Sequence, residues 1–230
     1  MVRMTTAHAR EKLKAIDASM PDSESWLEAF PEDGELYFYG EIGPIQWGGI
    51  DAALFASELR KMENQTFTMH LNSAGGSVDE GIAIYNAISH YKPGVTIIVD
   101  SLAASMASYI LCAGTKRIVH PNSAIMVHSP WSMTAGNADD LRKDAALLDK
   151  YGNRMVENYS LATGHSAKEI KRMLEAETWF FGQEAVDAGF ADEVLQPARR
   201  LNVAAKTRGW DSRLNTLHAR SRIAVMKANL

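Results

Sequence analysis

Residues 67–99, FTMHLNSAGGSVDEGIAIYNAISHYKPGVTIIV, contain two strand patterns on either side of a helical one. The run at 67–71 predicts a strand, and Gly75-Gly76 predicts a tight turn after it. Apolar spacing predicts a helix over about 78–91, and 95–99 predicts a second strand. A strand, a helix and a strand in this order are typical of parallel pairing through a right-handed crossover. The segment therefore predicts an α/β protein.

The same alternation continues on both sides of this unit. A strand is expected at 36–39 and a helix over about 50–62 before it. After it the sequence predicts a small-residue helix over about 104–113, short strands at 117–119 and 125–127, and a long helix over about 137–161.

Three of the expected helices begin with a side-chain capping signal. The long helix also has carboxylates in its positive first turn and is expected to end near Gly164. The caps are predicted at Asn137, at Ser166 with Glu169, and at Ser77 with Glu80.

Composition limits the class of protein. A chain of 230 residues with 46% hydrophobic residues suits one α/β domain with short extensions. The single cysteine, Cys112, lies in an apolar run, so it is interpreted as a buried small side chain and the chain can form no internal disulfide. No run reaches the ~18 apolar residues of a membrane helix, and residues 1–6 lack a secretory signal. We therefore expect a soluble, cytoplasmic protein without a membrane partner.

The chain divides into three parts. Residues 1–33 predict an N-terminal arm, a polar helical stretch followed by linkers with turns at Pro21 and Pro31. Residues 34–198 contain the alternating strands and helices and predict one α/β domain. Residues 199–230 form a basic C-terminal tail.

Positive charge is concentrated in this tail, whereas the rest of the chain is acidic. It has eight Lys/Arg and Asp211 as its only acidic residue, whereas the rest of the chain has 16 basic and 27 acidic residues. Trp210, Leu214 and Leu217 interleave with these charges at helical spacing. This pattern favours a protein-contact tail over nucleic-acid binding.

Three short segments carry the residue types of a serine hydrolase. Ser105 stands where the 95–99 strand leads into a helix, so its hydroxyl gains from the helix dipole. His128 ends an apolar strand, from which an imidazole can project into a cleft as a general base. The backbone N–H groups of the Gly75-Gly76 turn and of Met106 can point at an oxyanion. Each segment alone fits a structural role, but the three together predict nucleophile, base and oxyanion donors.

A catalytic triad also needs a carboxylate to hold the imidazole. Glu177, just before an aromatic run, is chosen for this role, whereas Asp139, Asp140 and Asp144 are assigned to the solvated face of the long helix. A serine–lysine pair that uses Lys116 is a smaller alternative. No cluster of His, Cys, Asp and Glu has the spacing of zinc ligands, so neither a metal nor another cofactor is predicted.

Over residues 35–197 the chain resembles the Clp protease proteolytic-subunit family, and especially its phage or prophage head-maturation branch. This resemblance implies a Clp/crotonase-like α/β fold of repeated β-β-α units, with the 137–161 helix as a protruding handle. The segments that carry the resemblance are LNSAGGS at 71–77, SLAASMA at 101–107, PNSAIMVHSP at 121–130 and QEAVDAGFAD at 183–192.

The resemblance also implies roles for single residues. Ser105 would be the nucleophile and His128 the general base, with the backbone amides of Gly76 and Met106 as the oxyanion hole. The third triad position falls on Glu177, where the better-known housekeeping members have aspartate. The family further implies heptameric rings that stack and enclose a chamber for protein or peptide substrates.

The function predicted from these features is a serine endopeptidase in the cytoplasm of a bacterium or a phage-infected bacterial host. In one setting it processes phage capsid or scaffold proteins, including its own basic tail, and in the other an ATP-dependent Clp-type unfoldase feeds it. The unmatched arm and the basic tail favour the first setting. The alternatives are a crotonase-like acyl-CoA enzyme and a catalytically silent assembly scaffold.

Overall fold

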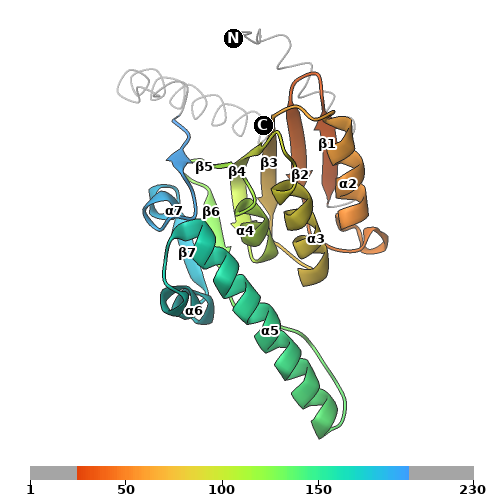
Figure 1. Cartoon of the computed structure of the whole chain (residues 1–230), viewed down its shortest axis with the longest axis vertical. Coiled ribbons are helices and arrows are strands. Elements are labelled where there is room, and N and C mark those ends of the chain that lie inside the picture. The colour runs from red at the N-terminus through yellow and green to blue at the C-terminus, as the bar shows by residue number, and fades with distance from the viewer. Residues whose placement is uncertain (1–24, 197–230) are drawn as a thin grey trace, which may run out of the picture. The chain divides into compact units, whose positions relative to one another are not determined.

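The structure, a computed structural model, describes residues 25–196 (Figure 1). Within this range eight strands form one mixed sheet, and helices pack against it, so the predicted α/β class is confirmed. Most of the predicted arm and the whole basic tail lie outside the described residues.

Between residues 35 and 163 the strands and α-helices follow the order that the sequence predicts. The strands are Trp26–Phe30 (β1), Glu35–Tyr39 (β2), Phe67–Ser73 (β3), Val95–Ala104 (β4), Lys116–Val119 (β5), Ala124–Val127 (β6), Thr178–Phe181 (β7) and Glu193–Val194 (β8). The helices are Ile45–Trp47 (η1, a 3-10 turn), Ala52–Lys61 (α2), Val78–Ser89 (α3), Met106–Leu111 (α4), Ala138–Thr163 (α5), Ala167–Glu175 (α6) and Gln183–Asp187 (α7).

Strand β4 organises the sheet. The strand order is β1-β2-β3-β4-β5-β8, in which only the β1–β2 pair is antiparallel. The first half of β4 pairs with β5, whereas its last residues, Leu102–Ala104, pair with β6. Strand β6 in turn pairs antiparallel with β7. The carboxyl end of β4 therefore lies between β3 and the antiparallel β6–β7 pair.

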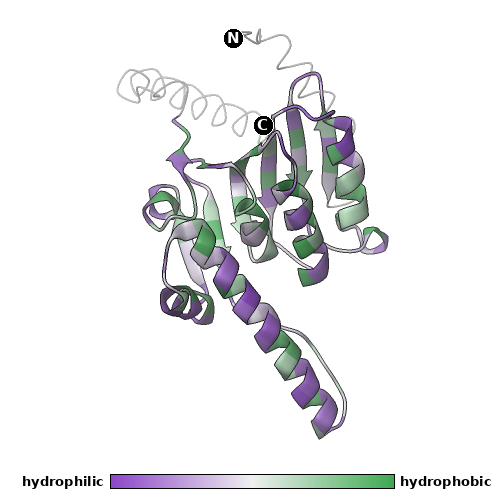
Figure 2. Cartoon of the chain, viewed as in Figure 1, coloured by the Kyte–Doolittle hydropathy of each residue, from purple (hydrophilic) through white to green (hydrophobic). Residues whose placement is uncertain are grey.

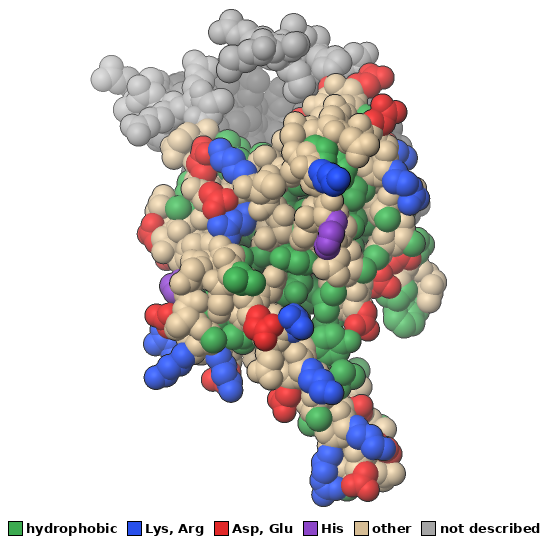
Figure 3. Space-filling model, viewed as in Figure 1, with side chains coloured by type: hydrophobic (Ala, Val, Ile, Leu, Met, Phe, Trp, Pro, Cys, Tyr) green, Lys and Arg blue, Asp and Glu red, His purple; other side chains and the backbone are tan. Residues whose placement is uncertain are grey.

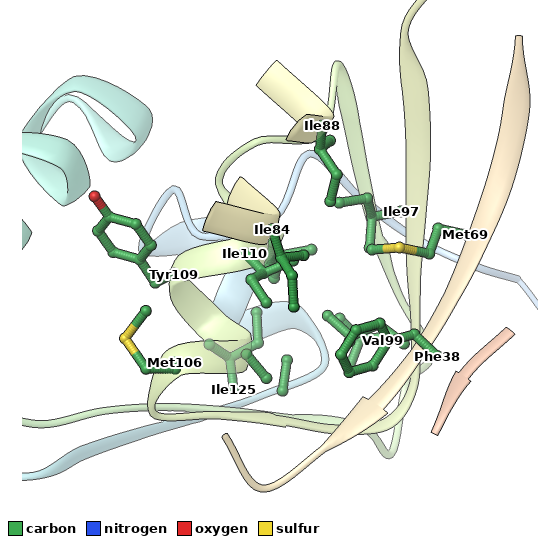
Figure 4. Packing of buried hydrophobic residues seen from close by; sticks show 14 of the residues in the cluster. Phe38, Met69, Ile84, Ile88, Ile97, Val99, Met106, Tyr109, Ile110 and Ile125 are labelled. Atoms are coloured by element: carbon green, nitrogen blue, oxygen red, sulfur yellow. The ribbon is translucent and has the colours of Figure 1, made fainter. Parts of the chain in front are cut away.

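Helices α2, α3 and α4 lie on the same side of the sheet (Figure 1). The core forms between them and the strands, and Figure 4 shows Ile84 and Ile110 from the helices near Ile97 and Val99 from β4. These side chains are fully buried because alternate strand residues face the helices. This packing holds the ends of β3 and β4 rigidly beside α4.

The long helix α5 extends away from the body (Figure 1). Figure 2 shows that its projecting part is mostly hydrophilic, whereas Met155 and Tyr159, near its carboxyl end, are buried against the body. Among the described residues, no helix has both the length and the apolar character needed to cross a membrane.

The sheet begins earlier than the sequence predicts. Trp26–Phe30, assigned above to the N-terminal arm, form β1 and pair with Glu35–Tyr39 across the turn at Pro31. The Trp26 ring stacks on Tyr37, with 5.0 Å between ring centroids. A five-residue edge strand has too weak a sequence pattern to be distinguished from a linker when its partner strand is not known.

The predicted caps of α5 and α6 are confirmed, and that of α3 needs a correction. Asn137 and Ser166 each form a complete capping box, and Gly164 ends α5 in the left-handed conformation. Ser77 does cap α3, but the Glu80 carboxylate accepts no hydrogen bond from the Ser77 backbone N–H. Glu80 instead accepts a hydrogen bond of 2.8 Å from the backbone N–H of Ala52, so it caps the neighbouring helix α2.

Candidate active site

Ser105 lies at the sharp turn between β4 and α4. Its backbone has φ 53° and ψ −125°, a conformation that L-residues rarely adopt and that is held only when the surroundings enforce it. Its N–H donates to the Met126 carbonyl at 2.9 Å, and its own carbonyl accepts from the Ser108 hydroxyl at 2.6 Å. The strained turn is therefore fixed on both sides, and it projects the Ser105 side chain from the end of the sheet.

His128 directly follows β6, the strand that pairs with the end of β4. Its Nε2 lies 2.7 Å from Ser105 Oγ. For His128 to act as a base, Nε2 accepts the hydroxyl hydrogen and Nδ1 carries the ring proton. The structure thus brings together two of the predicted residues at hydrogen-bond distance, although they are 23 positions apart in the chain.

Glu177 lies beside His128 because of the register of the antiparallel β6–β7 pair, in which Val127 is opposite Thr178. One carbonyl, that of Leu174, accepts hydrogen bonds from the N–H groups of both Ser129 and Glu177. The Glu177 side chain is exposed and accepts a long hydrogen bond of 3.5 Å from Trp179. Within residues 25–196, no hydrogen bond joins its carboxylate to His128, so this structure holds the pair as neighbours and not as bonded partners.

The Gly75–Gly76 turn lies against the start of α4. A Cβ added to Gly75 would be only 2.7 Å from the Ser105 Cβ and 2.8 Å from the Met106 nitrogen, so only glycine allows this approach. The amides of Gly76 and Met106 donate no hydrogen bond to another group of the described residues. Two unpaired backbone donors near a serine hydroxyl are suited to bind an oxyanion.

These residues line one cavity of about 650 Å³. Met126 and Trp131 both contribute to its wall, whereas the nearby Met133 is 89% exposed and does not. The full lining is Glu41, Ala74, Gly75, Gly76, Val78, Ser105, Met106, Met126, His128, Pro130, Trp131, Met155, Tyr159 and Glu177.

Other candidate groups lie outside this cavity. Lys116 forms an ion pair of 2.6 Å with Glu193 at the β5–β8 edge and does not line the cavity. Burial raises the pKa of the Cys112 thiol to about 12, so this cysteine is unsuited to be a nucleophile. No group of three or more potential metal ligands occurs within the part of the chain that the structure describes.

A second histidine–carboxylate cluster lies on the side of the sheet away from the helices. Asp100 contacts His70 Nδ1 at 2.9 Å and His120 Nε2 at 3.3 Å, and it accepts a hydrogen bond from Tyr39. Burial alone would raise the pKa of Asp100, but the hydrogen bonds from His70 and Tyr39 outweigh it, so the pKa is below its usual value. No serine, threonine or cysteine belongs to this described cluster.

Glu41 is a cavity residue that the sequence analysis misses. It follows Gly40 at the end of β2, and the next residue, Ile42, bonds to the glycine turn. The only available signal is its position directly after a strand, where loops of α/β folds often carry functional groups.

A serine hydroxyl, a histidine base and two unpaired amides around one cavity are the parts that serine hydrolases use. The model of the Clp protease family matches residues 22–198, most of the chain. The chain therefore belongs to the Clp protease family, with whose fold its mixed sheet and helices agree.

Curated relatives support this assignment. The chain is 40% identical over 130 residues to the ATP-dependent Clp protease proteolytic subunit 2 of Thermobifida fusca, covering 56% of this chain and 64% of the relative. It is 36% identical over 135 residues to subunit 1 of Frankia casuarinae, covering 58% and 63%. For subunit 1 of Streptomyces coelicolor the identity is 38% over 132 residues, covering 56% and 60%. The matched region thus spans less than two thirds of the length of each of these relatives.

Proposed function

We propose that this protein is a serine endopeptidase that cleaves peptide bonds through an acyl-enzyme on Ser105. The observation that carries the proposal is the 2.7 Å approach of His128 Nε2 to Ser105 Oγ at a strained turn beside two unpaired amides. Membership of the Clp protease family and the printed names of the relatives, which are proteolytic subunits, support it.

In the proposed mechanism, Ser105 Oγ attacks the substrate carbonyl carbon while His128 Nε2 takes the hydroxyl proton. The tetrahedral oxyanion accepts hydrogen bonds from the N–H groups of Gly76 and Met106. The carbon–nitrogen bond then breaks, and His128 returns the proton to the leaving amine. Water, activated by the same imidazole, releases the acyl group from Ser105.

Treatment with a fluorophosphonate probe tests this proposal. We expect stoichiometric labelling of Ser105, mapped by peptide mass spectrometry, and loss of labelling in His128→Ala because the hydroxyl then lacks its base. Absence of labelling in a folded, assembled sample would contradict the enzyme and favour a silent scaffold. Binding of acyl-CoA without labelling would favour the crotonase-like alternative.

Glu177 is proposed as the positioning residue that orients His128 and stabilises the imidazolium. We expect Glu177→Gln to lower kcat by about 10²- to 10⁴-fold, because the neutral amide can favour the wrong imidazole tautomer. Glu177→Asp is expected to recover much of the loss, since it keeps the charge. Equal loss in both variants, with unchanged thermal unfolding, would contradict this role; kcat over a pH series measures it.

The proposed active form is an oligomeric ring that encloses a chamber, heptameric and stacked through α5. Hydrophobic side chains gather where α5 leaves the body, and charged ones gather at its far end (Figure 3). A cavity of about 760 Å³ lies between α3, α4 and α5, lined by Tyr85, Tyr109 and the half-exposed Leu147 among others. Exposed apolar surface of this kind marks a contact between proteins.

For the biological setting we propose processing of phage capsid or scaffold proteins, which the basic composition of residues 199–230 favours. The relatives' name, ATP-dependent Clp protease proteolytic subunit, favours the other setting, in which a Clp ATPase delivers unfolded substrate. If this protein degraded a folded substrate only when such an ATPase and ATP were present, the second setting would be identified.

A further inference from the structure

The cavity around Ser105 has an acidic wall. Its lining includes the carboxylates of Glu41 and Glu177, whereas no Lys or Arg belongs to the lining among residues 25–196. The cavity wall therefore carries a net negative charge. How strongly each carboxylate acts on a substrate depends on whether it is already bound to another group of the protein. This negative charge acts directly on any substrate that reaches the nucleophile.

The segment that carries Glu41 is tied to the glycine turn. The N–H of Ile42 donates to the Gly75 carbonyl at 2.8 Å, and the N–H of Ser77 donates to the Ile42 carbonyl at 2.8 Å. On its other side, the Glu41 carbonyl accepts a hydrogen bond of 2.8 Å from Ile50. Because these hydrogen bonds hold both Glu41 and Ile42, the backbone of Glu41 keeps a constant position relative to the oxyanion donors.

The Glu41 carboxylate is available to a substrate. It is exposed, and no described residue forms an ion pair or a side-chain hydrogen bond with it. Nearby acidic side chains are engaged, since Glu80 accepts from Ala52 and Asp79 accepts from the Tyr151 hydroxyl. Of the two cavity carboxylates, Glu177 is proposed for the imidazole, which leaves Glu41 to act on the substrate.

A carboxylate on a cavity wall discriminates between substrate charges. Its field extends about 8 Å at physiological ionic strength, so it acts on substrate side chains that enter the cavity that Glu41 and Ser105 share. It attracts Lys or Arg and repels Asp or Glu, so the two effects add when such substrates are compared. The exposed ring of Trp131, on the same cavity, is a further surface to which a cationic side chain can bind.

We propose that Glu41 is a specificity-determining residue that selects peptides with a Lys or Arg side chain close to the scissile bond. This inference rests on the proposed peptidase function. Residues 199–230 of the chain, with eight Lys/Arg and one acidic residue, have the charge that such a cavity selects.

Quenched fluorescent peptides test the inference. The set is identical except for one position, occupied by Lys, Gln or Glu, placed in turn on each side of a leucine bond. For the wild type, we expect kcat/KM to be about tenfold higher for the better Lys peptide than for its Glu counterpart at low salt. Glu41→Gln is expected to reduce this ratio to about twofold, and Glu41→Lys to invert it. The matched control is Glu63→Gln, an exposed loop glutamate outside the cavity, which keeps the wild-type ratio.

Two outcomes would overturn the inference while leaving the peptidase intact. One is cleavage of all peptides with a Lys/Glu ratio near one, and the other is a wild-type ratio in Glu41→Gln. Failure of the proposed function is distinguishable from both, because the fluorophosphonate would then not label Ser105 and no peptide would be cleaved. Labelling is measured in every variant, so a misfolded variant is recognised before its ratio is interpreted.

Discussion

Ser105→Ala is expected to lower kcat for peptide hydrolysis by at least about 10⁴-fold and to abolish fluorophosphonate labelling. The methyl group cannot attack a carbonyl carbon, so the covalent route is lost and only the oxyanion donors and binding remain. Folding should be unaffected, because the Ser105 hydroxyl forms its hydrogen bond with His128 and with no buried group. Steady-state hydrolysis and thermal unfolding of the same preparations measure the two effects.

Ser101→Ala is the matched control, since Ser101 is an exposed serine four residues earlier in β4 and lies outside the cavity. It is expected to hydrolyse peptides at the wild-type rate. Turnover by Ser105→Ala at an undiminished rate would exclude the acyl-enzyme mechanism and would favour a site that uses only the two amides.

Gly75→Ala is expected to reduce kcat by about 10²- to 10³-fold and to destabilise the fold by about 1 kcal/mol or more. The new Cβ would lie 2.6 Å from the Ala104 carbonyl oxygen, as well as against Ser105 and Met106, so the turn has to move away from α4. That movement separates the Gly76 amide from the Met106 amide. Hydrolysis rates and denaturant unfolding curves report the two losses.

Gly164→Ala separates backbone strain from the clash. Gly164 has φ +79°, similar to the +95° of Gly75, but a Cβ there would meet nothing within 4 Å. We expect a comparable strain-related loss of stability with no loss of kcat in the folded protein. If both variants hydrolysed peptides equally well, the close approach of the glycine turn to Ser105 would have no role in catalysis.

The main parts of the site were predictable because their signals are local. Ser105 and His128 each stand at the end of an apolar strand, and strand ends of α/β folds meet at one edge of the sheet. The cap of α5 was predictable for the same reason, since Asn137 bonds to groups two and three residues away.

Other features depend on contacts that no local pattern contains. Glu80 follows Ser77 at the spacing of a capping box, yet its carboxylate bonds to Ala52, 28 residues earlier, because α2 and α3 pack side by side. Glu41 reaches the cavity only because Ile42 bridges to Gly76. The strand β1 exists as a strand only through its pairing with β2.

The sequence alone determined the order of the central strands and helices, the caps of α5 and α6 and the residue types available for acyl transfer, since each depends on neighbours within about four positions. The tertiary structure alone decided which of these residues share one cavity. The register shift between β3 and β4 sets Gly75 against Ser105, and the β6–β7 register sets Glu177 beside His128. Those registers arise from burial of whole strand faces against the helices, which is a property of the assembled sheet and not of any single segment.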